Sequence, residues 1–292
     1  METDRFVEVM GARVRYQVEG SGPPAVLIHG IGASLEFWQW TTPALRERYT
    51  TIALDFPGFG LSDPIASAST PEGAAAAILA FMDAVGVPRA VIIGSSLGGA
   101  IATLTAGTAP ARCAALVLAA PAGYGTGLSA TLRLMTARWV GEGFLALTRR
   151  FPRLGLREAF ADQRRIPDAL VEITRRNAAR LVTGETFLNT LRASVTLRGV
   201  RPGIVEQTRE VAARITAPTL IVWGTRDRVI PPDQADVAGR TIPNAQVHIM
   251  QGMGHVPFIE DAGAFNAALS AFLDRVEQFD AGRMTGVTGA GG

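Results

Sequence analysis

The sequence contains no lysine, so all 28 of its basic side chains are arginines, and against 26 acidic residues they leave a formal charge of only +2. The single cysteine, Cys113, cannot form an internal disulfide, and we interpret it as a small buried hydrophobe. With three histidines and no cysteine–histidine cluster, no structural zinc site is expected. The longest apolar runs have the size of strands, far short of the roughly 20 residues that a membrane-spanning helix needs.

The charge is distributed unevenly along the chain. Residues 122–214 hold 16 arginines against 8 acidic residues, and the rest of the chain is net acidic. The arginines alternate with apolar residues at helical spacing, which favours a solvated helix surface over a site for nucleic acid or an anionic membrane. The charged N-terminus leads directly into a strand-like segment, without the apolar stretch of a secretory signal. We therefore expect a cytoplasmic protein with no nucleic-acid partner and no integral membrane association.

Short apolar runs rich in β-branched residues recur along the chain, with helical or loop segments between most of them. They lie at residues 25–28, 51–54, 90–93, 116–118, 219–222 and 247–250. This alternation predicts a parallel sheet flanked by helices. Two further segments, 6–9 and 14–18, alternate in hydrophobicity around Gly11-Ala12 and predict an antiparallel hairpin at the sheet edge. The expected fold class is α/β, with an eight-stranded, mostly parallel sheet.

A long helical insertion is expected between the fourth and fifth of these runs. Its amphipathic stretches predict four or five short helices, which are interrupted by prolines and a glycine. The stretches are residues 128–140, 144–150, 169–181 and 186–197. We predict a core of residues 1–121 and 215–279, an inserted helical subdomain of residues 122–214, and a disordered tail of residues 280–292, which are rich in glycine and threonine.

The strongest local motif is Gly94-Ser95-Ser96-Leu97-Gly98-Gly99, which follows one predicted strand and precedes a helix-like segment. A strand that turns sharply into a helix forces the central residue into a strained conformation and requires glycines beside it. We predict that Ser96 is a nucleophile and that the Leu97 N–H stabilises an oxyanion at the helix N-terminus. Ser95 is the competing serine, but its position in the turn directs it away from the exposed apex.

A second motif, His29-Gly30-Ile31-Gly32, follows the strand at residues 25–28. Its position predicts that the Ile31 N–H is the other oxyanion donor and that Gly30 lets the chain pass close to a substrate carbonyl. His29 precedes the nucleophile in the chain and belongs to this loop. We therefore interpret His29 as structural.

The search for a general base is short, because only two other histidines remain. His248 lies inside a strand-like run, whereas His255 follows the last strand at the carboxyl edge, where functional residues gather in parallel sheets. Asp227 comes just after the preceding strand and reaches the same edge. We predict that His255 is the base and that Asp227 orients its ring.

These motifs, in this order, resemble the α/β-hydrolase superfamily from about Phe6 to Phe279. They comprise His29-Gly30, Asp55-Phe56-Pro57-Gly58-Phe59-Gly60-Leu61-Ser62, the serine motif, Trp223-Gly224-Thr225-Arg226-Asp227 and Gly254-His255. The resemblance implies a cap over the active site and no cofactor or metal. It implies hydrolysis of a small-molecule carboxylic ester through an acyl-enzyme on Ser96, since a serine nucleophile argues against haloalkane dehalogenases and epoxide hydrolases.

The closest alternative within the superfamily is a carbon–carbon bond hydrolase of meta-cleavage pathways, which acts on a 1,5-diketone acid. Such enzymes typically carry asparagine where this chain has Ser95 and tryptophan where it has Val256. A non-catalytic, small-molecule-binding member of the fold is an alternative of another class. The oligomeric state is expected to be monomer or homodimer.

Substrate contacts are assigned to Gly30, Ser95, Val256 and Trp139, the last as part of an apolar pocket under the cap. The cap also carries many arginines that could bind a substrate carboxylate, and the sequence does not single out one of them. Candidates are Arg133, Arg175 and Arg192.

Overall fold

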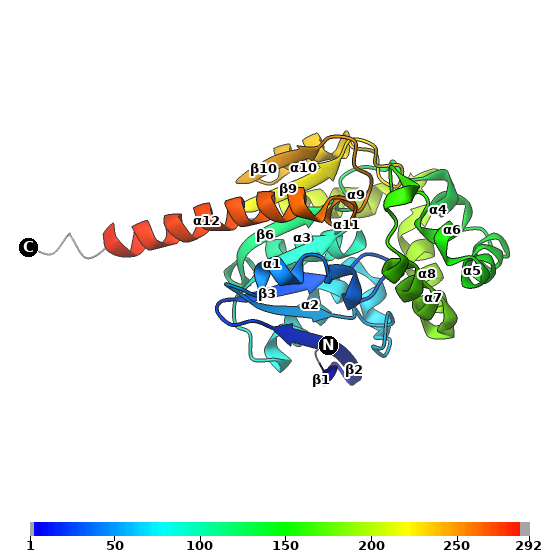
Figure 1. Ribbon diagram of the computed structural model, residues 1–292, viewed down its shortest axis with the longest axis horizontal. Coiled ribbons are helices and arrows are strands. Elements are labelled where there is room, and N and C mark those ends of the chain that lie inside the picture. Colours follow the sequence, from blue (N-terminus) through cyan, green and yellow to red (C-terminus); the bar gives the residue numbers. More distant parts are fainter. Residues whose placement is uncertain (1–2, 287–292) are drawn as a thin grey trace, which may run out of the picture.

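The structure, a computed structural model, describes residues 3–286. Its centre is an eight-stranded sheet in the order β1-β2-β4-β3-β5-β6-β9-β10 (Figure 1). The strands are β1 (Arg5–Val9), β2 (Ala12–Glu19), β3 (Pro24–Ile28), β4 (Thr50–Leu54), β5 (Ala90–Ser95), β6 (Cys113–Ala119), β9 (Thr219–Gly224) and β10 (Ala245–Met250). β2 pairs antiparallel with β1 and β4, and the other pairs are parallel. The predicted fold class and edge hairpin are confirmed.

The central strands are buried on both faces, which explains their continuous apolar runs. One hydrophobic core lies between the sheet and the helices α2 (Pro71–Ala84), α3 (Leu97–Thr108) and α10 (Gln234–Thr241). The second core lies on the other face, against α1 (Thr42–Leu45), α11 (Pro257–Glu260) and α12 (Ala262–Gly286). Cys113 is buried, in agreement with its interpretation as a core residue.

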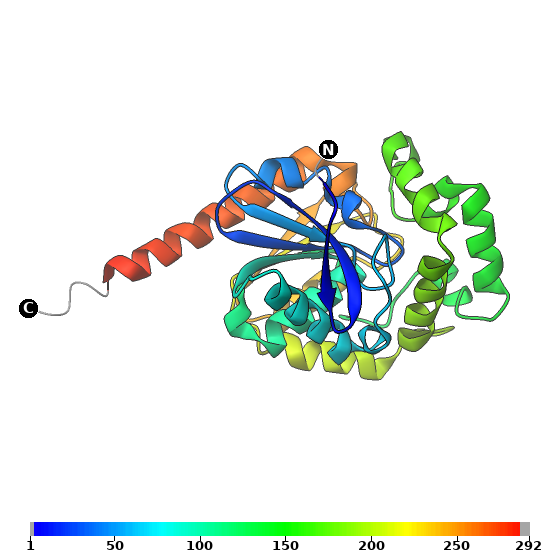
Figure 2. The ribbon, with the colours of Figure 1, turned by 90° about the horizontal axis from the view of Figure 1, so that it is seen from below.

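Most of the segment between β6 and β9 forms a separate group of helices at one end of the sheet (Figures 1 and 2). We call α4 to α8 the cap helices. They are α4 (Ala130–Leu134), α5 (Val140–Arg150), α6 (Pro152–Leu156), α7 (Asp168–Ala179) and α8 (Leu181–Ser194). Because the long axis of the molecule runs from α12 to these helices, α5 and the end of α12 lie at opposite ends of it (Figure 1).

The structure differs from the sequence-based expectation within this insertion. Two short strands, β7 (Val195–Thr196) and β8 (Gly199–Val200), pair antiparallel where no strand was expected. Two residues are too few to show an alternating pattern in the sequence. In addition, α9 (Pro202–Ala212) packs on the core helix α3, and a Cβ on Gly107 would lie 2.2 Å from the Val211 carbonyl oxygen. The division into core and cap stays a prediction; it assigns α9 to the cap, whereas α9 packs on the core helix α3.

The C-terminal segment also differs from expectation. Disorder was predicted for residues 280–292, but α12 continues to Gly286, so the prediction is wrong for residues 280–286. A helix that has already formed extends without a new nucleation step. Residues 287–292 lie outside the described part of the chain. Among residues 3–286, no helix has both the length and the apolar character needed to cross a bilayer.

Candidate active site

Ser96 occupies a sharp turn between β5 and α3. Its backbone has φ 54° and ψ −118°, which is unusual for a residue other than glycine. The Ser96 N–H donates to the Ala119 carbonyl on the neighbouring strand β6 at 3.0 Å, which holds the strained turn in place. The turn lies at the carboxyl edge of the sheet, as the sequence motif predicts.

Two glycines permit this turn because other backbone atoms approach them closely. A Cβ on Gly98 would lie 2.2 Å from the Ile28 carbonyl oxygen, and a Cβ on Gly94 would lie 2.2 Å from the Gly98 carbonyl oxygen. Gly30, from the loop after β3, lies directly against the serine, because a Cβ there would come within 3.2 Å of Ser96 Cβ. The loop after β3 and the serine turn are therefore packed directly against each other.

His255 and Asp227 form a buried pair beside this turn. His255 Nδ1 lies 2.8 Å from Asp227 Oδ2, and both side chains are less than a tenth exposed. The other Asp227 oxygen, Oδ1, accepts the N–H groups of Val229 and Ile230 at 2.8 and 2.9 Å. These bonds fix the carboxylate, so the imidazole ring has one preferred orientation.

Trp223 is a further partner of this pair that the sequence reasoning did not assign. Its indole N–H donates to Asp227 Oδ2 at 3.0 Å, so this oxygen binds both the indole and the histidine. Trp223 is fully buried in the core. Its position four residues before Asp227, at the end of a buried strand, is the signal that could have indicated this contact.

His29 is held in the core with both ring nitrogens occupied. The Phe56 N–H donates to Nε2 at 3.0 Å, which leaves the proton on Nδ1, and Nδ1 lies 2.7 Å from the Gly30 carbonyl oxygen. A histidine with no free nitrogen cannot accept a proton from Ser96. Its contacts instead fix the loop that carries Gly30 and Ile31, in line with the structural role expected from the sequence.

The two predicted oxyanion donors lie on the same cavity wall as Ser96. Ile31 and Leu97 both line this cavity, and Leu97 is the first residue of α3, where a backbone N–H has no acceptor within the helix. Within the described chain, neither N–H donates to another protein group. Both are therefore free to bind a negative oxygen atom.

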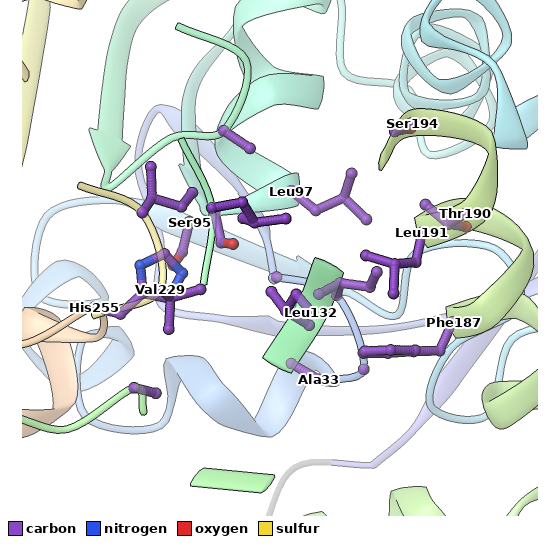
Figure 3. A pocket seen from close by; sticks show the side chains of 18 of the residues that line it. Ala33, Ser95, Leu97, Leu132, Phe187, Thr190, Leu191, Ser194, Val229 and His255 are labelled. Carbon is purple, nitrogen blue, oxygen red and sulfur yellow. The ribbon is translucent and has the colours of Figure 1, made fainter. Parts of the chain in front are cut away.

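The cavity has a volume of about 640 Å³ and lies between the sheet edge and the cap helices. Ser96 and His255 line its core side, and apolar side chains form most of the remaining wall. They include Leu97, Leu128, Leu132, Met135, Phe144, Phe187, Leu191 and Val229. Figure 3 shows Ser95 and His255 at one end, Leu132 in the middle, and Phe187, Thr190 and Leu191 of α8 at the other end.

Comparison with known proteins decides the family of this chain. A family model described as alpha/beta hydrolase fold matches residues 23–262. The chain belongs to this family.

Three similar proteins illustrate the range of chemistry in the family. The hydrolase is 33% identical over 275 residues, 92% of this chain and 68% of the relative, to the dihydrolipoyllysine-residue acetyltransferase component of the acetoin cleaving system of Cupriavidus necator. It is 29% identical over 280 residues, 92% of this chain and 99% of the relative, to the pimeloyl-[acyl-carrier protein] methyl ester esterase of Aliivibrio salmonicida. A solved meta-cleavage product hydrolase from Pseudomonas fluorescens matches 93% of this chain and 97% of its own, with 26% identity and a TM-score of 0.77.

Three of the four predicted substrate-contact residues line the cavity of the hydrolase, namely Gly30, Ser95 and Val256. Trp139 does not, and the prediction is corrected here. Its side chain is 85% exposed at the start of α5, because that helix turns Phe144 and Thr148 toward the cavity instead. An amphipathic pattern in the sequence identifies a helix, but it does not reveal where the helix begins and which flanking residue remains outside.

None of the three candidate carboxylate-binding arginines lines the cavity. Arg175 pairs with Glu172 on the surface of α7, and Arg192 pairs with Glu142 at 2.8 Å. The arginines on the cavity wall are Arg157 and Arg228, both exposed, which the sequence did not single out. No buried arginine lines the cavity among the described residues.

Glu260 connects the histidine loop of the hydrolase to the cap segment. Its buried carboxylate accepts the N–H groups of Gly254 at 2.7 Å, Ala161 at 3.2 Å and Asp162 at 2.9 Å. In addition, the Ala159 carbonyl accepts the His255 N–H at 2.8 Å. The backbone that carries His255 is therefore attached to residues 159–162, between α6 and α7.

Replacement of Glu260 by glutamine is expected to lower both stability and turnover. An amide offers one acceptor oxygen and presents an NH₂ group to an N–H, which leaves a buried donor unpaired and lowers the unfolding free energy by about 2 kcal/mol. A displaced His255 should lower kcat about tenfold with little change in KM. Urea unfolding and steady-state kinetics test both effects, with Glu206→Gln on α9 as the exposed control. Wild-type kcat in a destabilised E260Q protein would contradict the positioning role.

The hydrolase is also expected to lose stability as the pH falls below about 6.5, because of His29. Burial lowers the pKa of His29 below its ordinary value of 6.5, so the folded protein binds this proton less readily than the unfolded chain. Between the two pKa values, His29 should contribute a loss of about 1.4 kcal/mol per pH unit.

A His29→Gln variant can preserve both hydrogen bonds with a side chain that does not titrate. Urea unfolding of wild type and H29Q at about pH 7 and about pH 5 measures the difference in pH dependence. We expect a shallower loss of stability in the variant. An identical slope in both proteins would show that His29 binds its proton equally well in the folded and the unfolded state, which would contradict the lowered pKa.

Proposed function

We propose that the hydrolase cleaves a carboxylic ester of a small to medium apolar substrate through an acyl-enzyme on Ser96. The observation that carries this proposal is the Asp227–His255 hydrogen bond of 2.8 Å at a cavity wall that also contains Ser96. Nucleophilic acyl transfer requires a serine, a histidine whose ring is oriented, and a carboxylate that holds this ring.

The reaction begins when His255 Nε2 takes the proton of the Ser96 hydroxyl and Oγ attacks the ester carbonyl. The N–H groups of Ile31 and Leu97 stabilise the tetrahedral oxyanion. Collapse breaks the bond to the alkoxy oxygen, and the protonated His255 gives its proton to the leaving alcohol. Water, deprotonated by the same histidine, then attacks the acyl-enzyme, and the carboxylic acid leaves with regeneration of Ser96.

The wall of the cavity supports an apolar substrate. Aliphatic and aromatic side chains from the core and from all five cap helices surround the space in front of Ser96, and the charged residues on the wall are Arg157, Glu158 and Arg228. An acyl or alkyl chain that enters this space loses contact with water over most of its length, which favours binding.

Carbon–carbon bond cleavage is the second candidate, favoured by the likeness to the meta-cleavage product hydrolase. Arg157 and Arg228 would be the groups available to a substrate carboxylate. Both are exposed, whereas Ser95 and Val256 stand where such enzymes typically have asparagine and tryptophan. These features favour ester hydrolysis.

A panel of p-nitrophenyl esters from acetate to dodecanoate, measured beside one vinylogous 1,5-diketone acid, tests the proposal. We expect ester turnover with a maximum at one chain length, set by the depth of the cavity. Rapid cleavage of the diketone with poor ester turnover would replace the proposal by carbon–carbon bond hydrolysis. No turnover and no labelling of Ser96 by a fluorophosphonate would indicate a binding protein.

A further inference from the structure

The cap helices and the turns beside them expose several large apolar side chains to solvent. Of 13 exposed large hydrophobic residues among the described side chains, 5 fall within residues 130–156. They are Leu134, Trp139, Val140, Leu147 and Phe151, with exposed fractions of 45% or more. Exposed apolar residues that gather on one segment mark an interaction surface, whereas single scattered ones do not.

α5 is a helix with two functional faces. Its inner face sends Phe144 and Thr148 to the cavity wall. The flank beside that face exposes Val140 and Leu147, which lie seven residues apart, two turns along the helix, and a Cβ on Gly143 between them would meet no atom within 4 Å. The same helix thus lines the substrate cavity and also forms part of the outer surface. It lies at the end of the molecule away from α12 (Figure 1).

Trp139 at the start of α5 is held outward by the backbone. It has φ 70°, and its N–H donates to the Glu142 carboxylate at 2.9 Å, which fixes the first turn of the helix. A bulky residue in this conformation carries a free-energy cost. The other tryptophans contrast with it, because Trp38 and Trp223 are fully buried and Trp40 is partly buried.

The segment that carries these apolar side chains is basic. Residues 130–156 contain five arginines and one acidic residue, Glu142, which pairs with Arg192 at 2.8 Å. Arg138, Arg149 and Arg150 are exposed, and Arg150 lies over the ring of Phe151 at 5.7 Å. Within the described chain, none of these three arginines forms a salt bridge with a carboxylate.

We propose that this surface, the exposed apolar residues of segment 130–156 with Arg138 and Arg150, docks on an anionic lipid bilayer without crossing it. Tryptophan, leucine and phenylalanine enter the boundary between headgroups and acyl chains, while arginines bind the lipid phosphates. A bilayer complements both properties of the patch. A second copy related by two-fold symmetry would bring the arginines of the two chains together, and nucleic acid would leave Leu134, Val140 and Leu147 without an apolar partner.

Docking in this orientation would place α5, and behind it the cavity, against the membrane. A lipid-derived ester could then pass into the site without first entering water. The docking itself depends only on the cap surface and not on the chemistry at Ser96, so a failure of the proposed ester hydrolysis would leave it unaffected.

Vesicle binding by the full chain tests this proposal. Co-sedimentation is measured with vesicles of phosphatidylcholine containing phosphatidylglycerol and with vesicles of phosphatidylcholine alone, at rising sodium chloride. We expect binding to the anionic vesicles that weakens with salt, together with a blue shift of tryptophan fluorescence. Trp139→Ser should abolish the shift, and the double variant R138Q/R150Q should weaken binding roughly thirtyfold.

Matched controls carry similar changes on the core, away from the cap helices (Figure 1). Val247→Ser on β10 and Arg240→Gln on α10 remove an exposed apolar side chain and an exposed arginine, and both should bind vesicles like wild type. Thermal unfolding verifies that each variant is folded. Absence of binding to anionic vesicles, or equal binding by wild type and W139S, would overturn the proposal. Self-association lost in W139S, or binding of duplex DNA but not of vesicles, would also overturn it.

Discussion

Replacement of Ser96 by alanine is expected to lower kcat by about 10⁴-fold or more, while substrate still binds. Alanine removes the Oγ atom on which the acyl-enzyme forms and leaves the rest of the site unchanged. The turn itself should persist, because the Ser96 N–H bond to Ala119 and the close approaches around Gly94 and Gly98 involve only backbone. The small remaining rate would come from the free N–H groups of Ile31 and Leu97 acting on bound ester.

Steady-state turnover of the preferred p-nitrophenyl ester measures this effect, and a fluorophosphonate probe reports the nucleophile directly. Ser270→Ala on α12, outside the cavity, is the matched control and should behave like wild type. Thermal unfolding shows whether S96A is folded. Folded S96A protein with wild-type turnover would exclude Ser96 as the nucleophile and, with it, the proposed acyl-enzyme.

Replacement of Asp227 by asparagine is expected to lower kcat by about 10⁴-fold through the histidine tautomer. Oδ1 accepts the N–H groups of Val229 and Ile230, so the asparagine oxygen should occupy this position. Its NH₂ group would then face His255 Nδ1 and donate to it. The proton of the ring would move to Nε2, which could no longer accept the proton of Ser96.

The pH profile distinguishes this cause from a general loss of structure. At high pH, hydroxide can partly replace the missing base, so the deficit of D227N should shrink as the pH rises. The Trp223 indole N–H would also lose its acceptor and face the new NH₂ group, which should cost about 1–3 kcal/mol of unfolding free energy. An unchanged kcat in D227N would mean that Asp227 does not set the tautomer of His255.

The strand pattern was the most predictable part of the fold. The central strands are buried on both faces, so they require uninterrupted apolar runs, and those runs are visible in the sequence without knowledge of their neighbours. The serine turn was recognisable in the sequence for a similar reason. Its glycines are required because backbone atoms approach them so closely that a side chain would not fit. The cytoplasmic location and the oligomeric state stay predictions.

Contacts between distant segments were not predictable in this way. Nothing near Glu260 in the chain indicates that its carboxylate accepts N–H groups from residues 161 and 162, almost 100 positions earlier. The exposure of Trp139 and the packing of α9 on α3 likewise depend on how the cap helices sit on the core. Helical periodicity gives each helix an apolar side, but many neighbours can cover such a side.

The sequence by itself thus determined the α/β sheet, the order of its motifs and the residue types available for catalysis, because local backbone geometry and burial on both faces leave direct traces in composition and spacing. Only the tertiary structure decided which side chains share the cavity, which arginines remain outside it and which face of α5 meets solvent. Those outcomes arise from packing between segments far apart in the chain, where shape and hydrogen-bond partners, rather than hydrophobicity alone, select one arrangement.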